Sequence, residues 1–311
     1  MKQQTLEKKR KLSPGEIIPL FYDEAFKIMY ANPNHLEILT LLLSRILKVD
    51  YKDIEGKITL EPLSIPNKKI GEKKSERDVV VSVKSTDKYK IILEVNVRKK
   101  FYQSIMDRNI FYKNEVASNG IYEGDDYSNL PITILVNFNT FYVDKVHEKI
   151  FDEYLLRNEE GFILTKREKV LNIHIVKCKD LWYHNEYQGM FEPIEEDLIL
   201  LCAAMVVDKH EDFIKILEEV RTRPEIKELM EVVLTDMNSN QEMYARYNDW
   251  KEEEEKITKS IIAEEREDAI KSNQQEIVMN MYNKKYKLED ISEIVNLSVE
   301  EVKKIIVEFN S

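Results

Sequence analysis

The chain has 311 residues, of which 43% are hydrophobic and only seven are glycine and eight proline, which excludes a fibrous or low-complexity protein. This length is enough for one domain of about 150–200 residues with additional segments. Two cysteines exclude a disulfide framework, and the longest apolar run, 198–207, is too short to cross a membrane and predicts a buried helix. We therefore expect a cytoplasmic protein without a membrane segment, and the charged first residues do not resemble a secretory signal.

The net charge of −11 argues against a protein that coats nucleic acid, because phosphate binding depends on Lys and Arg. The charge is unevenly distributed, however, since acidic residues gather toward the C-terminus at 252–255 and 264–268. Basic clusters lie in the N-terminal part, at 8–11, 68–69, 73–77 and 98–100. Such clusters usually belong to a solvated surface, but the last two flank the candidate site described below.

The first predicted elements are two helices, over residues 20–30 and 33–48, which Asn32-Pro33-Asn34 separates. Three predicted strands follow, at 58–65, 79–83 and 91–97. The last two are rich in β-branched residues and are separated by the turn-like residues 85–88, so they predict a hairpin.

The remaining predicted elements are a helix, two strands and a helical region, at 101–122, 132–138, 172–178 and 195–308. The first of these strands is almost entirely apolar, which is typical of a strand buried on both faces. In the helical region, residues 251–272 indicate a charged connector helix. Near its end, Ser298 and Glu301 have the spacing of a capping box, which predicts the start of the last helix.

This order of elements predicts an α/β fold, with a mixed sheet flanked by helices and an all-α C-terminal extension. We expect a core over residues 1–180, a helical extension over 181–250, and a connector helix with a small helical unit over 251–311. The small unit is either a helix-turn-helix that contacts DNA or a unit for tethering and oligomerisation. Glu300 and Glu301 in its last helix favour the second interpretation, and with it a homo-oligomer.

The residues that indicate chemistry are Asp78, Glu94 and Asn96, in or beside the predicted hairpin. Glu94 interrupts an apolar strand, where an acid must face solvent or a site because a lone buried carboxylate is costly. Glu94 and Asn96 share a face, since strand side chains alternate. Asp78 joins that face only if the turn has an odd length, such as residues 85–87, whereas a four-residue turn places Asp78 opposite Val95.

In the first register the two carboxylates would lie about 5 Å apart at their Cβ atoms. Such a pair repels unless a cation lies between its members, and oxygen ligands with open water positions suit Mg²⁺ or Mn²⁺. A divalent ion there would activate water and neutralise charge on a phosphate. The alternative is that both acids protect an edge strand from aggregation, and the spacing alone does not decide between the two.

Several segments match the pattern of a known family in order along the chain: YDEAFKIMY, NHLEILTLLLSRIL, RDVVVSV, ILEVNV, the helix with Arg108 and Tyr112, and the tail YKLEDISEIVNLSVEEVKKII. Together they resemble the transposase-like PD-(D/E)XK nucleases, also called recombination-promoting nucleases. The resemblance covers nearly the whole chain. It implies a restriction-endonuclease-like core in which Asp78 and Glu94 are catalytic and bind the metal ion with the backbone carbonyl of Val95.

The resemblance also assigns further residues. Asp23 matches the helix-borne catalytic acid of the family, with Glu37 as the competing candidate. Asn96 stands where the superfamily has Lys and the transposase-like branch often has Gln. Asn can hydrogen-bond an attacking water but supplies no charge to the transition state, so we expect slow activity.

The residues expected to bind the substrate are Arg77, Arg98, Lys99, Arg108 and Tyr112. Arg108 and Tyr112 share one helix face, and for them phosphate contact and a structural ion pair with packing are equally good interpretations.

The predicted function is that of a Mg²⁺-dependent deoxyribonuclease, an endonuclease that cuts DNA in recombination or transposition. One alternative is a nucleic-acid-binding protein derived from such a nuclease, in which Asn96 marks the loss of catalysis. Another is a non-enzymatic interaction protein built on the C-terminal helices.

Overall fold

The computed structural model describes residues 12–62, 77–84, 88–98, 100–118, 126, 130–144, 146 and 148–310. The chain divides into two compact units, residues 1–247 and 248–311. Within the described residues, no helix is both long and apolar enough to cross a membrane.

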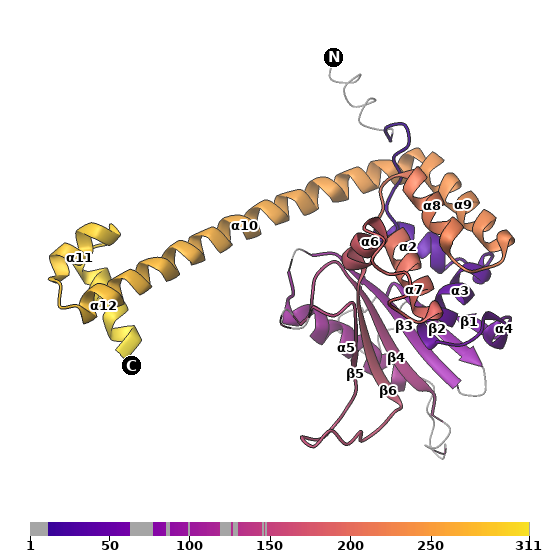
Figure 1. Ribbon diagram of the computed structural model, residues 1–311, viewed down its shortest axis with the longest axis horizontal. Coiled ribbons are helices and arrows are strands. Elements are labelled where there is room, and N and C mark those ends of the chain that lie inside the picture. The colour runs from indigo at the N-terminus through magenta and orange to yellow at the C-terminus, as the bar shows by residue number, and fades with distance from the viewer. Residues whose placement is uncertain are drawn as a thin grey trace, which may run out of the picture. The chain divides into compact units, whose positions relative to one another are not determined.

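The described residues of the first unit form a six-stranded sheet in the order β1-β2-β3-β4-β6-β5 (Figure 1). Its strands are β1 (Ile58–Leu60), β2 (Val79–Lys84), β3 (Lys88–Asn96), β4 (Ile132–Asn139), β5 (Phe151–Tyr154) and β6 (Glu168–His174). β3, β4 and β6 are parallel, whereas β1 and β2 pair antiparallel to their neighbours on one side and β5 on the other. The predicted mixed sheet is confirmed.

The hairpin of β2 and β3 has the register in which Asp78 and Glu94 share a face. Val79 pairs with Leu93 and Lys84 with Lys88, so three residues separate the strands. Continuing this register by one position places Asp78 opposite Glu94. Both strands lie inside the sheet, whose edges are β1 and β5, so the interpretation of these acids as edge-strand charges is wrong.

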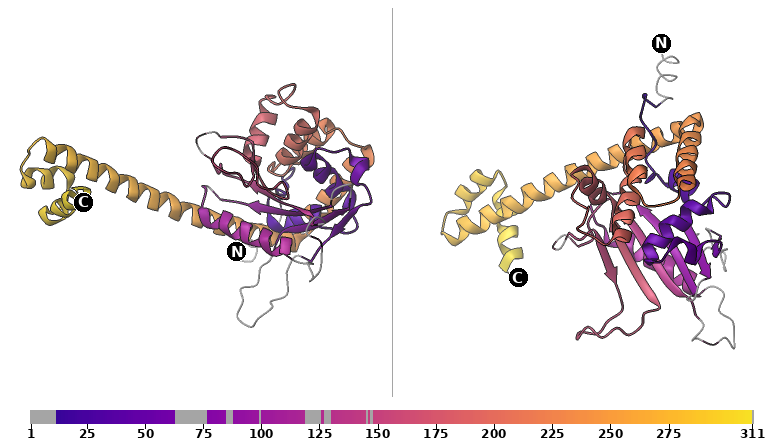
Figure 2. Two further views of the ribbon diagram at one scale, coloured as in Figure 1. Left: turned by 90° about the horizontal axis from the view of Figure 1, so that it is seen from below. Right: turned by 45° about the vertical axis from the view of Figure 1, so that its right-hand side comes forward.

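Helices cover both faces of the sheet (Figures 1 and 2). On one face, α5 (Gln103–Ser118) contributes Val116 to an apolar cluster with Val80, Ile92 and Leu135. On the other face, the ring of Phe26 in α2 (Asp23–Tyr30) lies 5.7 Å from that of Phe138. The side view in Figure 2 (left) shows α5 on one side of the strands and the helices of the other layer on the opposite side.

The second helical layer explains the long apolar run of the sequence. α7 (Pro193–Ala204) is buried from Glu196 to its end and packs against α3 (Leu36–Leu47), α6 (Ile175–Tyr183) and α8 (His210–Glu219), which confirms the predicted buried helix. The layer also includes α4 (Tyr51–Ile54) and α9 (Pro224–Ser239).

Several predicted element bounds differ from the structure, and three C-terminal ends are instructive. The strand predicted at 172–178 ends at His174, because this residue caps α6 by accepting a hydrogen bond from the Lys177 amide at 3.0 Å. β1 ends at Leu60, two residues before Pro62, which has no amide N–H to donate to a sheet, and 63–65 of the predicted strand lie outside the described residues. α5 ends at Ser118 among the described residues, and 119–122 of the predicted helix lie outside them.

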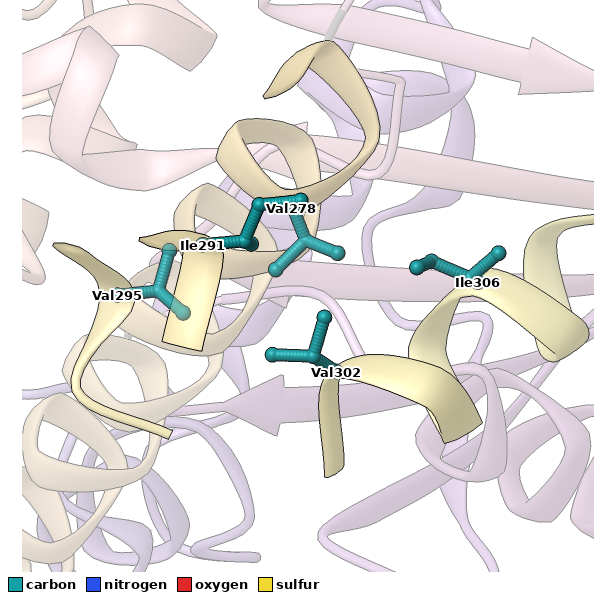
Figure 3. Close-up of a cluster of buried hydrophobic side chains, with 5 residues drawn as sticks. All are labelled: Val278, Ile291, Val295, Val302 and Ile306. Atoms are coloured by element: carbon teal, nitrogen blue, oxygen red, sulfur yellow. The ribbon is translucent and has the colours of Figure 1, made fainter. Parts of the chain in front are cut away.

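The second unit consists of most of α10 (Gln241–Asn283) together with α11 (Leu288–Val295) and α12 (Val299–Asn310). Its core is formed by five buried side chains, Val278, Ile291, Val295, Val302 and Ile306 (Figure 3). The predicted capping box is present, since the Glu301 amide donates to Ser298 Oγ at 3.2 Å and the Ser298 amide donates to Glu301 Oε2 at 2.8 Å. The role of this unit in oligomerisation stays a prediction.

Candidate active site

The candidate site lies where β2 begins and the parallel strands end. Glu94 of β3 is opposite Asn137 of β4, which is opposite Asn172 of β6. These three residues point to the face that α5 covers, and all are buried. The parallel strands therefore deliver a row of polar side chains to one end of the sheet, where Asp78 joins it from the hairpin.

Asp78 and Glu94 form a carboxyl pair in which Glu94 is buried and Asp78 is partly buried. Asp78 Oδ2 accepts a hydrogen bond from the Val95 amide at 2.8 Å, which fixes the side chain at the strand end. Glu94 is only 3% exposed, and its Oε1 atom has no hydrogen-bond partner among the described residues. Burial raises the pKa of both carboxyl groups, and the charges of Asp23 on Asp78 and of Asp78 on Glu94 raise them further.

Helix α2 brings two more charged groups to Asp78. Lys27 Nζ lies 2.9 Å from Asp23 Oδ1 and 3.7 Å from Asp78 Oδ1. Asp23 also raises the pKa of Asp78, as a neighbouring acid does. Glu37, the competing candidate for the helix-borne acid, lies near Tyr51 of α4 instead. The structure thus brings Asp23, and not Glu37, to the carboxyl pair.

Asn96 does not have the free amide that its predicted role with a water requires. Its Nδ2 donates to Asn139 Oδ1 at 2.9 Å, and its Oδ1 accepts from Asn109 Nδ2 at 3.1 Å and from Arg108 Nη2 at 3.2 Å. Asn109 also donates to Asn137 Oδ1 at 2.8 Å, and Asn137 donates to Asn172 Oδ1 at 2.8 Å. Asn96 therefore belongs to a buried amide network of Asn96, Asn109, Asn137, Asn139 and Asn172.

Arg77 also departs from its prediction as a substrate contact. Its side chain is fully buried, its Nη2 pairs with Glu115 at 2.7 Å, and its guanidinium lies over the Tyr112 ring at 5.4 Å. A buried guanidinium cannot touch a polyanion in this arrangement. Arg77 instead connects the start of β2 to α5, and the guanidinium of Arg108 lies 5.8 Å from the same Tyr112 ring.

Arg108 is the predicted substrate contact that reaches the carboxyl pair. Its side chain is 46% exposed, and its Nη2 lies 4.0 Å from Glu94 Oε2. Arg98 lies after β3, where its Nη1 donates to the Val97 carbonyl at 2.8 Å. Lys99 lies outside the described residues.

The residues present fit a divalent cation at the carboxyl pair. A buried carboxylate oxygen without a partner, beside a second carboxylate, is costly without a positive charge. Oxygen donors of this kind suit Mg²⁺ or Mn²⁺. In the described part of the chain, no three or more His, Cys, Asp or Glu side chains are grouped to hold a metal ion. Such a cation would therefore take its other ligands from backbone, water or substrate oxygens.

Lys27 and the asparagines of α5, β4 and β6 were given no role from the sequence. The sequence could have predicted the buried amides of β4, because Asn137 and Asn139 lie two residues apart in the most apolar predicted strand and so share a buried face. Lys27 had a signal in its place within the matched segment YDEAFKIMY, one helical turn after Asp23. For Asn109 the sequence holds no comparable signal, because its partners come from distant elements.

Comparison with known proteins identifies the family. Neither curated proteins nor solved structures gave a match. The family model described as "PD-(D/E)XK nuclease family transposase" matches residues 20–263, which include the whole sheet and the carboxyl pair. Because this match covers most of the chain, the chain belongs to the PD-(D/E)XK nuclease family transposases.

Proposed function

We propose that the protein is a metal-dependent endonuclease that hydrolyses phosphodiester bonds of DNA in recombination or transposition. The observation that carries this proposal is the buried Glu94 Oε1, which lacks a partner beside Asp78 in a chain of a nuclease family. A bound cation would stabilise a site of this kind, and in a nuclease family such a cation serves the hydrolysis of phosphodiester bonds.

Asp78, Glu94 and the backbone carbonyl of Val95 would hold Mg²⁺ or Mn²⁺, with Asp23 as the nearby helix-borne acid. When bound, the ion supplies an activated water and neutralises charge on the phosphate. Arg108 is half-exposed beside Glu94 and would bind a phosphate oxygen, for which its planar guanidinium is suited. Asn96 would orient Arg108 through the hydrogen bond at 3.2 Å, in place of a direct contact with water.

The remaining predicted contacts would act at the border of the site. Arg98 and Lys99 follow β3 directly and would contact the DNA backbone. Tyr112 would position the Arg108 guanidinium against its ring.

The test is the nicking of plasmid DNA by the full chain in Mg²⁺ or Mn²⁺. Asp78→Ala and Glu94→Ala should abolish nicking, because each removes one of the two carboxylates that would hold the cation. Asp107→Ala, which removes an exposed acid of α5, should nick like the unchanged protein. Mn²⁺ should also raise the melting temperature of the unchanged protein and of Asp107→Ala, but not of the other two variants. If Asp78→Ala and Glu94→Ala both cut at the original rate, the site is wrongly assigned.

A second candidate function is DNA binding without catalysis. It is favoured by the amide network, in which both the Nδ2 and the Oδ1 of Asn96 are hydrogen-bonded to other side chains. Asn96 is fully engaged and uncharged, so the site would depend on other residues for catalysis. This candidate predicts DNA binding that weakens with salt, without cleavage in any divalent ion.

A further inference from the structure

Lys27 is held at the carboxyl pair by a rigid helix. Its neighbour Phe26 is fully buried against Phe138 of the sheet, and Met29 and Tyr30 of the same helix are buried as well. Lys27 itself is only partly buried, with 24% of its side chain exposed. The helix thus anchors the side chain at its base and presents the ammonium group at the site, 3.7 Å from Asp78 Oδ1.

Asp23 orients this ammonium group without enclosing it. The two residues are one helical turn apart, and Asp23 is 59% exposed. An exposed ion pair of this type is weak, so an arriving phosphate can compete for the ammonium group. Lys27 therefore combines a fixed position with an accessible charge.

The other basic groups around the site are engaged in different contacts. Arg77 is fully buried with Glu115, and Lys113 is buried with Glu168 at 2.6 Å. Lys90 lies four residues before Glu94 on β3, with its Nζ 3.4 Å from the Val116 carbonyl. Arg108 approaches Glu94 from α5, whereas Lys27 approaches Asp78 from α2. The carboxyl pair is thus flanked by one cation from each helical layer.

We propose that Lys27 is a catalytic residue whose ammonium group contacts the scissile phosphate beside Asp78 and stabilises the negative charge that develops there. This inference rests on the proposed nuclease function. In the hydrolysis a water oxygen forms a bond to phosphorus, and the bond from phosphorus to the leaving oxygen breaks. The water gives its proton to solvent and the leaving oxygen takes one from solvent, so Lys27 supplies charge and no proton. It provides the charge that Asn96 cannot supply.

The experiment compares single-turnover cleavage by the full chain and by Lys27→Gln, with the protein in saturating excess over DNA and Mn²⁺ at saturation. The rate should fall about 100-fold, the effect typical of removing one group that stabilises a transition state. The Mn²⁺-induced rise in melting temperature should remain or increase, because the lost cation repels a metal ion at Asp78. Lys215→Gln is the matched control, since Lys215 forms an equivalent pair one turn from Glu211 at 2.6 Å in α8. It should cut at the original rate.

A chemical rescue separates charge from packing. Lys27→Cys should cut as poorly as Lys27→Gln and should recover when bromoethylamine converts the new thiol to a lysine analogue. Cys178 and Cys202 are buried, so the new thiol is the accessible one of the three. The catalytic role is overturned if Lys27→Gln cuts at the original rate, or if this variant loses both cutting and stabilisation by Mn²⁺. It is also overturned if Lys27→Cys does not recover cutting after complete alkylation. An unchanged protein that does not cut at all overturns the proposed nuclease function as well.

Discussion

On the face of the sheet that α5 covers, the two ends of the parallel strands differ in what they bury. Toward the start of the strands, Ile92 and Leu135 pack with Val116 of α5. Toward the end of the same strands, two residues further along, Glu94 and Asn137 are equally buried but polar. The helix α5 thus makes a polar contact through Asn109 and, two turns further along, an apolar contact through Val116.

At the polar end, the buried asparagines and the buried Glu94 differ in their hydrogen bonding. The asparagine side chains satisfy one another, which buried amides require because an unpaired amide costs about 1–3 kcal/mol. Glu94 Oε1 has no such partner among the described residues. The comparison indicates that burial alone does not mark the candidate site, since the amides are buried and complete. The distinguishing feature is a buried acid, Glu94, with a carboxyl oxygen that lacks a partner among the described residues.

The largest expected effect concerns the charge of that acid. Burial and the charge of Asp78 raise the pKa of Glu94 from 4.5 to about 8, so the folded state binds this proton more tightly than the unfolded state. Without metal, the free energy of unfolding should therefore fall as pH rises from about 5 to 8, by up to a few kcal/mol. Urea unfolding in a chelator measures this, and Glu94→Gln should show a smaller fall. An equally steep fall in Glu94→Gln would assign the effect to other groups.

A smaller effect is expected from breaking the amide network. Asn137→Leu removes the partner of Asn109 and of Asn172 in a buried place, which should lower the free energy of unfolding by about 2–4 kcal/mol. Asn114→Leu, at an exposed position of the same helix α5, is the control and should change stability little. Urea denaturation at constant pH gives both values. A neutral Asn137→Leu would mean that the network contributes no stability.

The smallest effect is expected at the apolar end. Val116→Ala removes two methyl groups from the cluster with Val80, Ile92 and Leu135 and should cost about 1–2 kcal/mol. Below its melting temperature the variant should still cut DNA and respond to Mn²⁺ like the unchanged protein. A large loss of cutting in a folded Val116→Ala protein would show that the two ends of the helix do not act separately.

Local sequence patterns predicted the parts of the molecule that depend on near neighbours. The hairpin, the capping box of Ser298 and Glu301, and the shared face of Glu94 and Asn96 each follow from spacing over a few residues. The register was left open because three- and four-residue turns were both compatible with residues 85–88. The register of the described strands, in which Lys84 pairs with Lys88, leaves three residues between them.

Long-range contacts were beyond those patterns. Arg77 is next to Asp78 in the sequence, which suggested a basic border to the site, yet Glu115 and Tyr112 of α5 enclose it. Asn96 was assigned a role from the residue that the family has at its position, whereas in the structure its side chain is hydrogen-bonded to asparagines of two other elements, β4 and α5. β5 pairs with β6 over a segment of mixed polarity, which carries no strong strand pattern.

The two contacts of α5 with the sheet have a mechanical consequence. Asn109 and Val116 are seven residues apart, so they lie on one stripe of the helix and touch the sheet together. Any rotation of α5 about its axis would break the amide contact and the apolar contact at once. The two contacts therefore oppose rotation of the helix about its axis. Arg108 is next to Asn109, so its guanidinium is held near Glu94 although nearly half of its side chain is exposed to solvent.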